Sequence, residues 1–401
     1  MFRRESGRAV ATLVRLTGDF DLAEEAVQDA FTVAVERWPR DGIPDNPGAW
    51  ITATARNRAI DRLRRDKRLA EKTEAIGQLV RLETSVGEPS EQTAIADDRL
   101  RLIFTCCHPA LAPDLQVALT LRTLGGLTTP EIARAFLVPE PTLAQRIVRA
   151  KRKIREARIP YSVPPEDLLP ERLMGVLGTL YLIFNEGYLA SAGDSLIRRE
   201  LSEEAIRLAR VLVQLMPDEP EAAGLLALML LHDSRRETRV SAEGDLILLE
   251  DQDRSRWNRE RIDEGTQLVE DALRRGSPGP YQIQAAISAV HGNAETPADT
   301  DWADIVALYD ALLAIQDTPV IHLNRAVAVA MADGPEAGLS LVDGLAGALD
   351  DYHLFYSARA DLLRRMDRRD EALAAYERAL ELTTNDIERR FLDRRIADLG
   401  G

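Results

Sequence analysis

Residues 127–158 read LTTPEIARAFLVPEPTLAQRIVRAKRKIREAR, and the rest of the chain is interpreted outward from this stretch. It predicts two helices with a break near residues 137–139, and the second helix is strongly basic. At 100° per residue, the second helix has one narrow apolar face made of Leu143, Ile147, Ala150 and Ile154. Hydrogen-bonding and cationic side chains lie on the opposite face: Thr142, Gln145, Arg149, Arg152 and Lys153. A helix that docks by one face and presents such groups on the other suits the major groove, so we predict DNA binding.

The whole chain indicates a helical protein of several domains. Its 401 residues are enough for about two to four domains, and nearly every segment has helical rather than alternating periodicity. No apolar run is long enough to span a membrane, and the N-terminus lacks the apolar core of a signal peptide. The only cysteines, Cys106 and Cys107, are adjacent and poorly placed to bridge each other, which fits a reducing compartment. We therefore expect an all-α, cytoplasmic protein.

The net charge of −15 is unevenly divided. Through residue 158 there are 26 Lys and Arg against 22 Asp and Glu, a balance of +4. From residue 159 onward there are 25 against 44, a balance of −19, and the two parts sum to −15. This asymmetry indicates an acidic module joined to one that binds nucleic acid.

The first block, residues 3–68, predicts three helices separated by a turn at 18–19 and a proline- and glycine-rich loop at 39–48. The second helix, 21–38, offers four residues for packing: Leu22, Ala26, Phe31 and Val35. The third helix starts near Ala49, and residues 56–72 hold eight basic and three acidic side chains, a net of +5. Its expected buried face consists of Ala53, Ala59, Ile60 and Leu63.

Trp50 lies on the polar side of the third helix, near Asn57, Asp61 and Arg64. A large aromatic side chain among cations is a platform for a base or for the sugar-phosphate backbone. The alternative is that Trp50 packs against a neighbouring helix. Because a second cationic cluster follows in residues 127–158, the arginines are more than a solvated helix end.

Three ordered motifs resemble extracytoplasmic-function sigma factors of the sigma-70 family. The motif DLAEEAVQDAF at 21–31 resembles the region-two helix that binds the RNA polymerase clamp, and residues 50–65 resemble the helix that meets the −10 element. Residues 127–158 resemble the region-four helix-turn-helix for the −35 element, with Pro141 where a glycine is usual. The chain starts almost at the first helix, so its N-terminus is expected to be short for this family. The implied domains are region 2 at 1–68, a linker at 69–96 and region 4 at 97–158.

The resemblance implies three sets of contact residues. Melted bases must be stacked or held in a pocket to stay unpaired. The resemblance implies that the third helix and the 39–47 loop hold them. This loop carries Asp41, Ile43 and Asn46 but no aromatic residue. Near the N-terminal half of the recognition helix, Gln145 and Arg149 would read base edges. The −10 set is Trp50, Arg56, Asn57, Arg58, Asp61, Arg62, Arg64, Arg65 and Arg68. The −35 set is Thr142, Gln145, Arg146, Arg149, Arg152 and Lys153, of which Arg146, Arg152 and Lys153 would bind phosphates. The polymerase set is Asp21, Glu24, Glu25, Val27, Gln28, Asp29 and Phe31.

A 34-residue period marks the end of the chain. Ala326, Val329, Gly338, Val342 and Leu345 recur as Ala360, Leu363, Ala372, Tyr376 and Ala379. We predict that 159–401 forms a tetratricopeptide-like solenoid of about five helix pairs, with a polar insertion or long loop at 233–255 and a terminal helix at 387–399. Such a stack has a concave surface that usually binds peptides or proteins; the alternative is a purely structural arm.

The stretch YLIFNEGY at 181–188 resembles a subgroup of these factors with a C-terminal extension. The resemblance implies that the extension regulates the sigma factor. We expect Tyr181 and Phe184 to pack, and Asn185 and Glu186 to contact the sigma domains or a partner.

No constellation predicts catalysis, a metal or a cofactor. Consecutive helical residues diverge by about 100°, so Cys106, Cys107 and His108 do not converge on one ion and are expected to pack. We predict an alternative sigma factor, not an enzyme, whose partners are core RNA polymerase, promoter DNA and a protein or peptide on the solenoid, with no membrane. The alternatives are a helix-turn-helix regulator with a peptide- or ligand-sensing repeat domain, and a scaffold that binds anionic partners without sequence preference.

Overall fold

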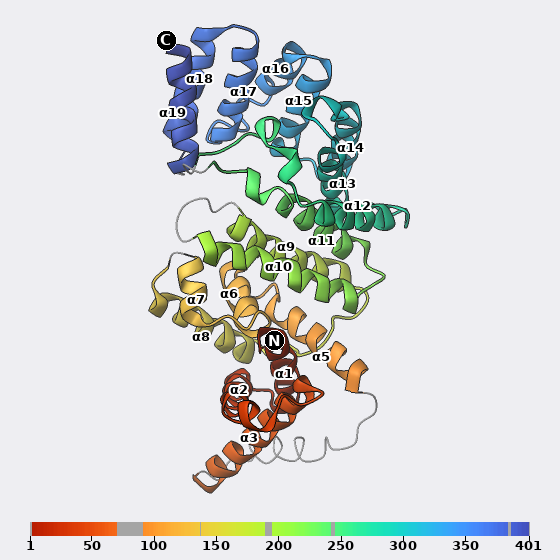
Figure 1. Ribbon diagram of the computed structural model, residues 1–401, viewed down its shortest axis with the longest axis vertical. Helices are drawn as coiled ribbons and strands as arrows, with labels where there is room; N and C mark the ends of the chain where they lie inside the picture. The colour runs from red at the N-terminus through yellow and green to blue at the C-terminus, as the bar shows by residue number, and fades with distance from the viewer. Residues whose placement is uncertain are drawn as a thin grey trace. The chain divides into compact units, whose positions relative to one another are not determined.

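The computed structural model describes residues 2–69, 91–136, 138–188, 195–241, 245–383 and 386–400 (Figure 1). Within these residues the regular elements are helices, apart from one isolated antiparallel bridge between Val240 and Leu246. The predicted all-α class is confirmed. The chain divides into two compact units: Met1–Gly187 with Glu203–Leu215, and Tyr188–Ser202 with Met216–Gly401. No described helix combines the length and the apolar character needed to cross a membrane.

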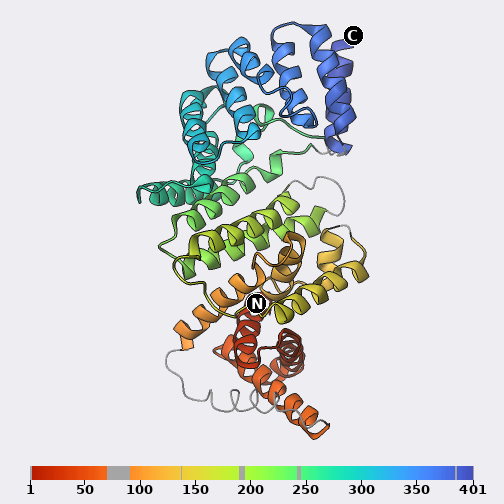
Figure 2. The same cartoon turned by 180° about the vertical axis from the view of Figure 1, so that it is seen from behind.

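The first unit begins with a bundle of three helices, α1 (Phe2–Thr17), α2 (Phe20–Asp41) and α3 (Pro47–Leu69). Asp19 starts α2, since its side chain accepts hydrogen bonds from the backbone N–H groups of Asp21 and Leu22. The helix continues through Pro39, where only one backbone hydrogen bond is lost, and ends at Gly42 with a φ of 83°. The loop is therefore 42–46, shorter than predicted. In both views α3 extends beyond the other two helices (Figures 1 and 2).

The buried face of α3 differs from the prediction. Ala53 is exposed and Ile60 is half-buried, whereas Ile51, Ala55, Ala59 and Leu63 are buried. These four residues follow an i, i+4 spacing that starts from Ile51, the largest apolar side chain in the first turns. Val35 of α2, expected to pack, is 61% exposed.

The next four helices are α5 (Glu91–Cys106), α6 (Pro113–Thr123), α7 (Thr129–Ala135) and α8 (Glu140–Glu156). Thr128 and Glu131 form a reciprocal capping box at the start of α7. The break between α7 and α8 confirms the two-helix prediction. The apolar stripe of α8 is also confirmed, because Leu143, Ile147, Ala150 and Ile154 are at most 7% exposed.

Parts of two further helices, α9 (Leu169–Tyr188) and α10 (Ser195–Leu215), belong to the same unit. The Arg172 guanidinium donates to the Phe104 carbonyl at 2.7 Å, and Thr179 donates to the Gln116 amide oxygen at 2.9 Å. Arg207 of α10 donates to the Leu124 carbonyl at 3.0 Å. The first unit therefore extends past residue 158, where the sequence placed a domain limit. Most of the predicted linker, residues 70–90, lies outside the described residues.

The second unit is a succession of helices in which chain neighbours pack side by side (Figures 1 and 2). Its helices are α11 (Pro220–Asp233), α12 (Arg259–Leu273), α13 (Pro280–Asn293), α14 (Trp302–Ile315), α15 (Pro319–Asp333), α16 (Pro335–Asp343), α17 (His353–Arg365), α18 (Arg369–Leu382) and α19 (Asp386–Gly400). A Cβ at Gly338 would lie 2.3 Å from the Ala330 Cβ, so α15 and α16 approach too closely for a side chain there. Tyr376 is 2% exposed and packs in one core with Ala360 and Leu363. The tetratricopeptide-like solenoid is confirmed.

Between α11 and α12 the described residues of the loop include three short 3-10 helices, η1 (Arg236–Thr238), η2 (Leu249–Asp251) and η3 (Arg254–Arg256). The Trp257 indole donates to Thr238 at 3.0 Å, and Thr238 contacts the Gln252 amide oxygen at 3.3 Å. The Arg254 guanidinium, 7% exposed as a residue, donates to the carbonyls of His291 and Ala294. This is the insertion expected at 233–255, and its base is fixed to the solenoid.

Candidate nucleic-acid and polymerase interface

Helix α8 presents its polar face to solvent. Thr142, Gln145, Arg149, Arg152 and Lys153 are all exposed. Arg146 is half-buried and lies 3.5 Å from an Asp114 carboxylate oxygen of α6, and Arg152 lies 3.6 Å from Glu156. The buried stripe holds the helix against α6 and α7, and the exposed side offers amide and guanidinium donors of the kind that read base edges.

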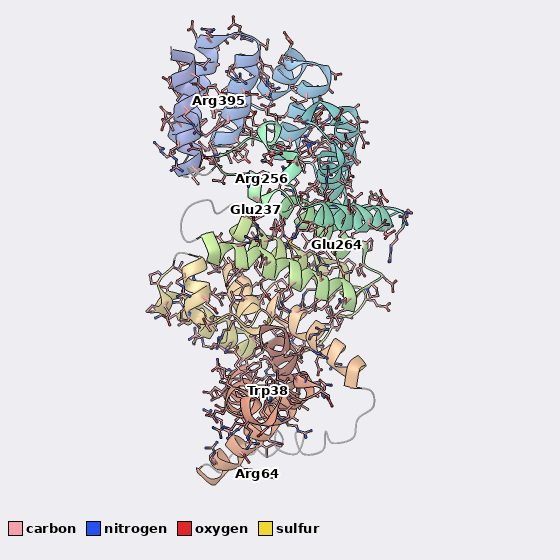
Figure 3. All side chains as sticks on the ribbon, in the orientation of Figure 1. Trp38, Arg64, Glu237, Arg256, Glu264 and Arg395 are labelled. Atoms are coloured by element: carbon pink, nitrogen blue, oxygen red, sulfur yellow. The ribbon has the colours of Figure 1, made fainter. Side chains whose placement is uncertain are left out.

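Helix α3 carries most of the predicted −10 set on an exposed surface. Asn57, Arg58, Asp61, Arg64 and Arg65 are exposed, and Arg64 lies toward the far end of the helix (Figure 3). Arg62 is also exposed, but its guanidinium lies 2.6 Å from the Glu25 carboxylate of α2. A residue predicted to bind DNA is thus paired with one predicted to bind polymerase. Arg56 is half-buried, and the side chain of Arg68 lies outside the described residues.

Trp50 packs against Trp38 of α2. The two ring centroids are 5.4 Å apart at an interplanar angle of 62°, an edge-to-face contact. Of the two alternatives for Trp50, packing against a neighbouring helix is the one seen here. The residue remains partly exposed, at the start of the helix that carries the arginines.

One face of α2 divides into a covered and an open half. On the helical projection Asp21, Glu24, Gln28, Phe31 and Val35 lie within 80° of one another. Gln28 and Val35 are exposed, and Phe31 is partly so. Asp29 and Glu25 are exposed beside this face. Val27 is 2% exposed and belongs to the core, so the predicted polymerase set loses Val27 as a contact.

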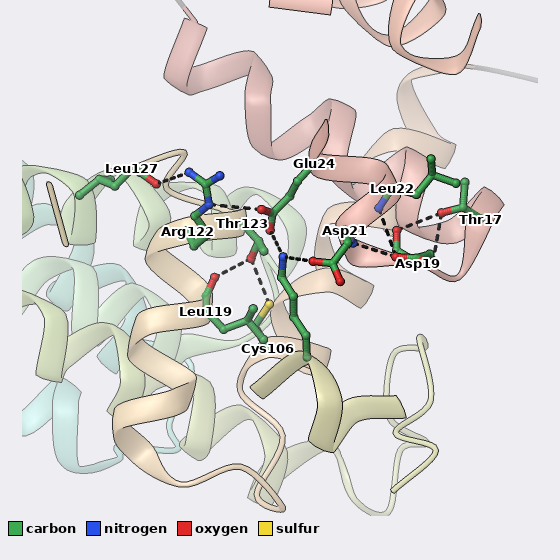
Figure 4. A network of polar contacts seen from close by, with 11 residues as sticks. Thr17, Asp19, Asp21, Leu22, Glu24, Cys106, Leu119, Arg122, Thr123 and Leu127 are labelled. Atoms are coloured by element: carbon green, nitrogen blue, oxygen red, sulfur yellow. Dashed lines mark hydrogen bonds and ion pairs between the residues drawn. The ribbon is translucent and has the colours of Figure 1, made fainter. Parts of the chain in front are cut away.

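The covered half of this face binds two cations from the neighbouring helices (Figure 4). The Lys151 ammonium of α8 lies 2.8 Å from an Asp21 carboxylate oxygen and 3.2 Å from one of Glu24. The Arg122 guanidinium of α6 lies 3.2 Å from the other Glu24 oxygen and also donates to the Leu127 carbonyl. The side chains of Lys151, Glu24 and Arg122 are 9%, 11% and 18% exposed, whereas that of Asp21 is 62% exposed. We call these four residues, Asp21, Glu24, Arg122 and Lys151, the charge cluster.

The sequence interpretation missed the charge cluster. Lys151 stands 80° from Leu143 on the projection of α8, at the border of the apolar stripe rather than opposite it. A cation at that position is the signal for a buried partner, because a charge leaves water only when it is paired.

A second connection joins the segment after α8 to the first bundle. The Tyr161 hydroxyl lies 2.8 Å from the Ala11 carbonyl of α1 and 3.0 Å from the Asp98 carbonyl of α5. The Asp98 side chain, 1% exposed, accepts from Arg15 and Arg101. Burial raises the pKa of Tyr161 well above its usual value, so its hydroxyl stays protonated and able to donate.

The two cysteines are packing residues, as expected. Cys106 Sγ lies 3.3 Å from the Thr123 hydroxyl and Cys107 Sγ lies 3.6 Å from that of Thr120. Burial raises the pKa of Cys107 to about 11 and raises that of Cys106 further, so both remain thiols. Among the described residues no group of three His, Cys, Asp or Glu side chains could hold a metal ion.

Near the end of α9, Phe184 lies inward of Tyr181, Asn185 and Glu186. Phe184 is fully buried and Tyr181 stacks on it, with centroids 6.5 Å apart. Asn185 and Glu186 are half-exposed. Glu186 lines a pocket of about 170 Å³ whose other walls include Asp114 of α6 and Arg146 of α8. Glu186 therefore lies beside residues of the helix-turn-helix.

Comparisons with known proteins agree with this geometry. The sigma-70 region 2 family matches residues 1–69, and the sigma-70 region 4 family matches residues 101–154. A probable ECF RNA polymerase sigma factor, SigI of Mycobacterium tuberculosis, is 30% identical over 38% of this chain and 52% of its own length. The chain belongs to the extracytoplasmic-function sigma factors of the sigma-70 family.

The C-terminal extension of this sigma factor has relatives of its own. A family of unknown function, DUF6596, matches residues 172–273, which run from α9 to α12. The uncharacterized protein R00370 of Rhizobium meliloti is 44% identical over 96% of this chain and 92% of its own length, so the similarity covers nearly the whole of both chains. The solved TPR domain of P58(IPK) aligns over 94% of this chain and 98% of its own length, with a TM-score of 0.26 and 14% identity. That similarity is too low to support an argument, and the description as a solenoid rests on the helix pairing.

Proposed function

We propose that this sigma factor binds core RNA polymerase through α2, holds the melted −10 strand on α3 and reads the −35 duplex with α8. The observation that carries the proposal is the exposed polar face of α8, on the same chain as the exposed arginines of α3. The matches to sigma-70 regions 2 and 4 support pairing these faces with two promoter elements. The domain limits of the proposal are 1–68 for region 2 and 97–158 for region 4, and the protein would act in the cytoplasm, where polymerase and promoter meet.

On this proposal the open half of the α2 face, with Gln28, Phe31 and Val35, makes the first contact with polymerase. Glu24 in the covered half becomes available only when Lys151 and Arg122 leave it, whereas Asp21 is already largely exposed. The charge cluster would therefore hold the free protein in a closed state, and polymerase would favour the open one by binding the whole face. Release would also free α8 to reach a −35 element apart from the −10 element.

The extension would act on the −35-binding domain through α9 and α10. Arg172, Thr179 and Arg207 hold these helices to the carbonyl and amide groups of α5, of α6 and of the turn after α6. Glu186 lines the pocket that also includes Arg146, a predicted phosphate contact. A ligand that moves α9 or α10 would thus move residues that contact the domain of the recognition helix. This connection supports regulation by the extension.

The test is transcription in a purified system with core polymerase and a promoter selected by this protein. We expect copurification with core polymerase and initiation at a −35/−10 promoter. Arg149→Ala should relax preference at one −35 base pair, whereas Arg155→Ala, which removes the same charge from an exposed position outside the predicted base-reading set, should leave preference unchanged. Binding to duplex DNA without any association with core polymerase would instead support the helix-turn-helix regulator, and affinity without sequence preference would support the scaffold.

A further inference from the structure

The loop between α11 and α12 sends a segment along the helices of the solenoid. We call residues 245–251 the strap. In Figures 1 and 2 the chain after α11, coloured green, runs alongside the blue helices toward the start of α19. The Ser241 N–H donates to the Asp245 carbonyl at 2.8 Å, and the Ile247 N–H donates to the Arg239 carbonyl at 2.9 Å. Residues 245–248 thus run antiparallel to residues 239–241 before the chain enters η2 (Leu249–Asp251).

Both ends of the strap are acidic and meet arginines of the solenoid. Asp245 forms ion pairs with Arg390, at 3.5 Å, and with Arg394 of α19. Glu250 lies 3.4 Å from Arg365 of α17, which also pairs with Asp361. These cations face the strap although the chain from residue 159 onward has a net charge of −19. Charge complementarity therefore fixes the direction and register of the strap on these helices.

Between its charged ends the strap covers an apolar groove without filling it. A cavity of about 360 Å³ remains, lined among others by Leu246, Leu248, Leu323, Tyr352, Tyr376 and Phe391. The strap leucines remain partly exposed, and Leu323 and Tyr376 belong to the core of the solenoid. Asn324 and Ser357 also line this cavity and offer polar groups to an extended backbone.

We propose that the groove formed by α15, α17, α18 and α19 is a binding site for an extended segment of a partner protein, and that the strap is its internal occupant. The strap shows the chemistry of that segment: an acidic residue, apolar side chains of leucine size at alternate positions, and a second acidic residue, as in the sequence DLILLE at 245–250. In an extended chain alternate side chains face the same way, so residues equivalent to Leu246 and Leu248 would enter the groove together. The partner displaces the strap and takes over its arginines.

A labelled peptide copying residues 239–252 tests the proposal by fluorescence anisotropy with the full-length protein. The strap-released variant, Asp245→Asn with Leu246→Asn and Leu248→Asn, should bind this peptide roughly tenfold or more tightly than the unsubstituted protein, because a tethered competitor acts at a high effective concentration. In that background Arg390→Gln with Arg394→Gln should abolish binding. Arg369→Gln, which removes an exposed arginine of α18 that pairs with Asp367, should leave binding unchanged.

A second measurement uses the protein without substitutions, so it does not depend on the folding of the variant. Saturating peptide should accelerate amide hydrogen exchange in residues 245–251, as expected for a displaced strap. A strap-released protein that keeps its helical content but binds the peptide no better than a scrambled one would overturn the proposal. Unchanged exchange in the strap at saturating peptide would also overturn it, and the strap would then be a fixed structural element. Neither result bears on whether the chain directs transcription.

Discussion

Adjacent carboxylates of α2, Glu24 and Glu25, should differ sharply in their contribution to stability. Glu24 is 11% exposed and lies between Lys151 and Arg122, both of which are largely buried. Glu25 is 49% exposed and its partner Arg62 is 45% exposed, although their contact is shorter at 2.6 Å. Since solvent screens the second pair and not the first, burial rather than distance should decide the effect of each substitution.

For Glu24→Gln we expect a loss of about 2–3 kcal/mol in the free energy of unfolding of the first unit. Removing one partner of a buried ion pair costs about 3–5 kcal/mol, because a buried charge is left uncompensated. The value here should be lower, since Asp21 still faces Lys151 and the Leu127 carbonyl still accepts from Arg122. For Glu25→Gln we expect a loss of at most about 1 kcal/mol, the range of exposed pairs.

Urea unfolding followed by the fluorescence of Trp38 and Trp50, with Trp257 and Trp302 replaced by Phe in every protein compared, measures both losses. A double-mutant cycle of Glu24→Gln with Lys151→Met should give a coupling energy of about 1.5–3 kcal/mol, as for a contact between charged groups of low exposure. If Glu24→Gln and Glu25→Gln shift the transition equally, or if the cycle shows no coupling, the argument from burial is wrong. If the closed state is autoinhibitory, Glu24→Gln should also loosen the contact of α8 with α2, seen as greater protease sensitivity after residue 158.

Four other outcomes are expected. Arg149→Ala should cost about 1–3 kcal/mol of promoter binding and relax specificity at one base pair, measured by competition among −35 variants; unchanged preference would remove Arg149 from the base-reading set. Gly338→Ala should destabilise the solenoid by about 1–3 kcal/mol through overpacking against Ala330, whereas Gly178→Ala, whose added methyl meets nothing within 4 Å, should be neutral or stabilising; equal midpoints in thermal unfolding would contradict this. Burial lowers the pKa of His232 to about 3 and that of His291 to about 4. Below about pH 6.5, the ordinary histidine pKa, the unfolded chain therefore binds more protons than the folded one, and the free energy of unfolding should fall. The urea midpoint of a His232→Gln variant should depend less on pH between 6.5 and 4. Because burial raises the pKa of Cys107 to about 11, neither cysteine should react with iodoacetamide at pH 8 until the protein is unfolded, which mass spectrometry can check.

The elements that the sequence predicted well are those governed by local periodicity. The stripe of α8 and the 34-residue period of the solenoid follow from repeats within a helix or between neighbouring helices, so the residues themselves carry the information. Contacts between distant segments carry no such local signal: Lys151 meets Asp21 from 130 residues away, and Arg394 meets Asp245 from 149 residues away. The α3 face was misassigned because small residues such as Ala53 mark either side of a helix, and the larger Ile51 decides which one is buried.

The edge-to-face contact of Trp38 and Trp50 has a mechanical consequence. It joins the last turns of α2 to the first turn of α3. Two large rings therefore hold together the helix ends that the short connection at 42–46 links. A movement of one helix is transmitted to the other through this contact. Separating the two helices by bending the connection would break a ring contact worth about 0.5–1.5 kcal/mol. A partner that binds α2 would therefore also set the orientation of α3 and of the arginines that it carries.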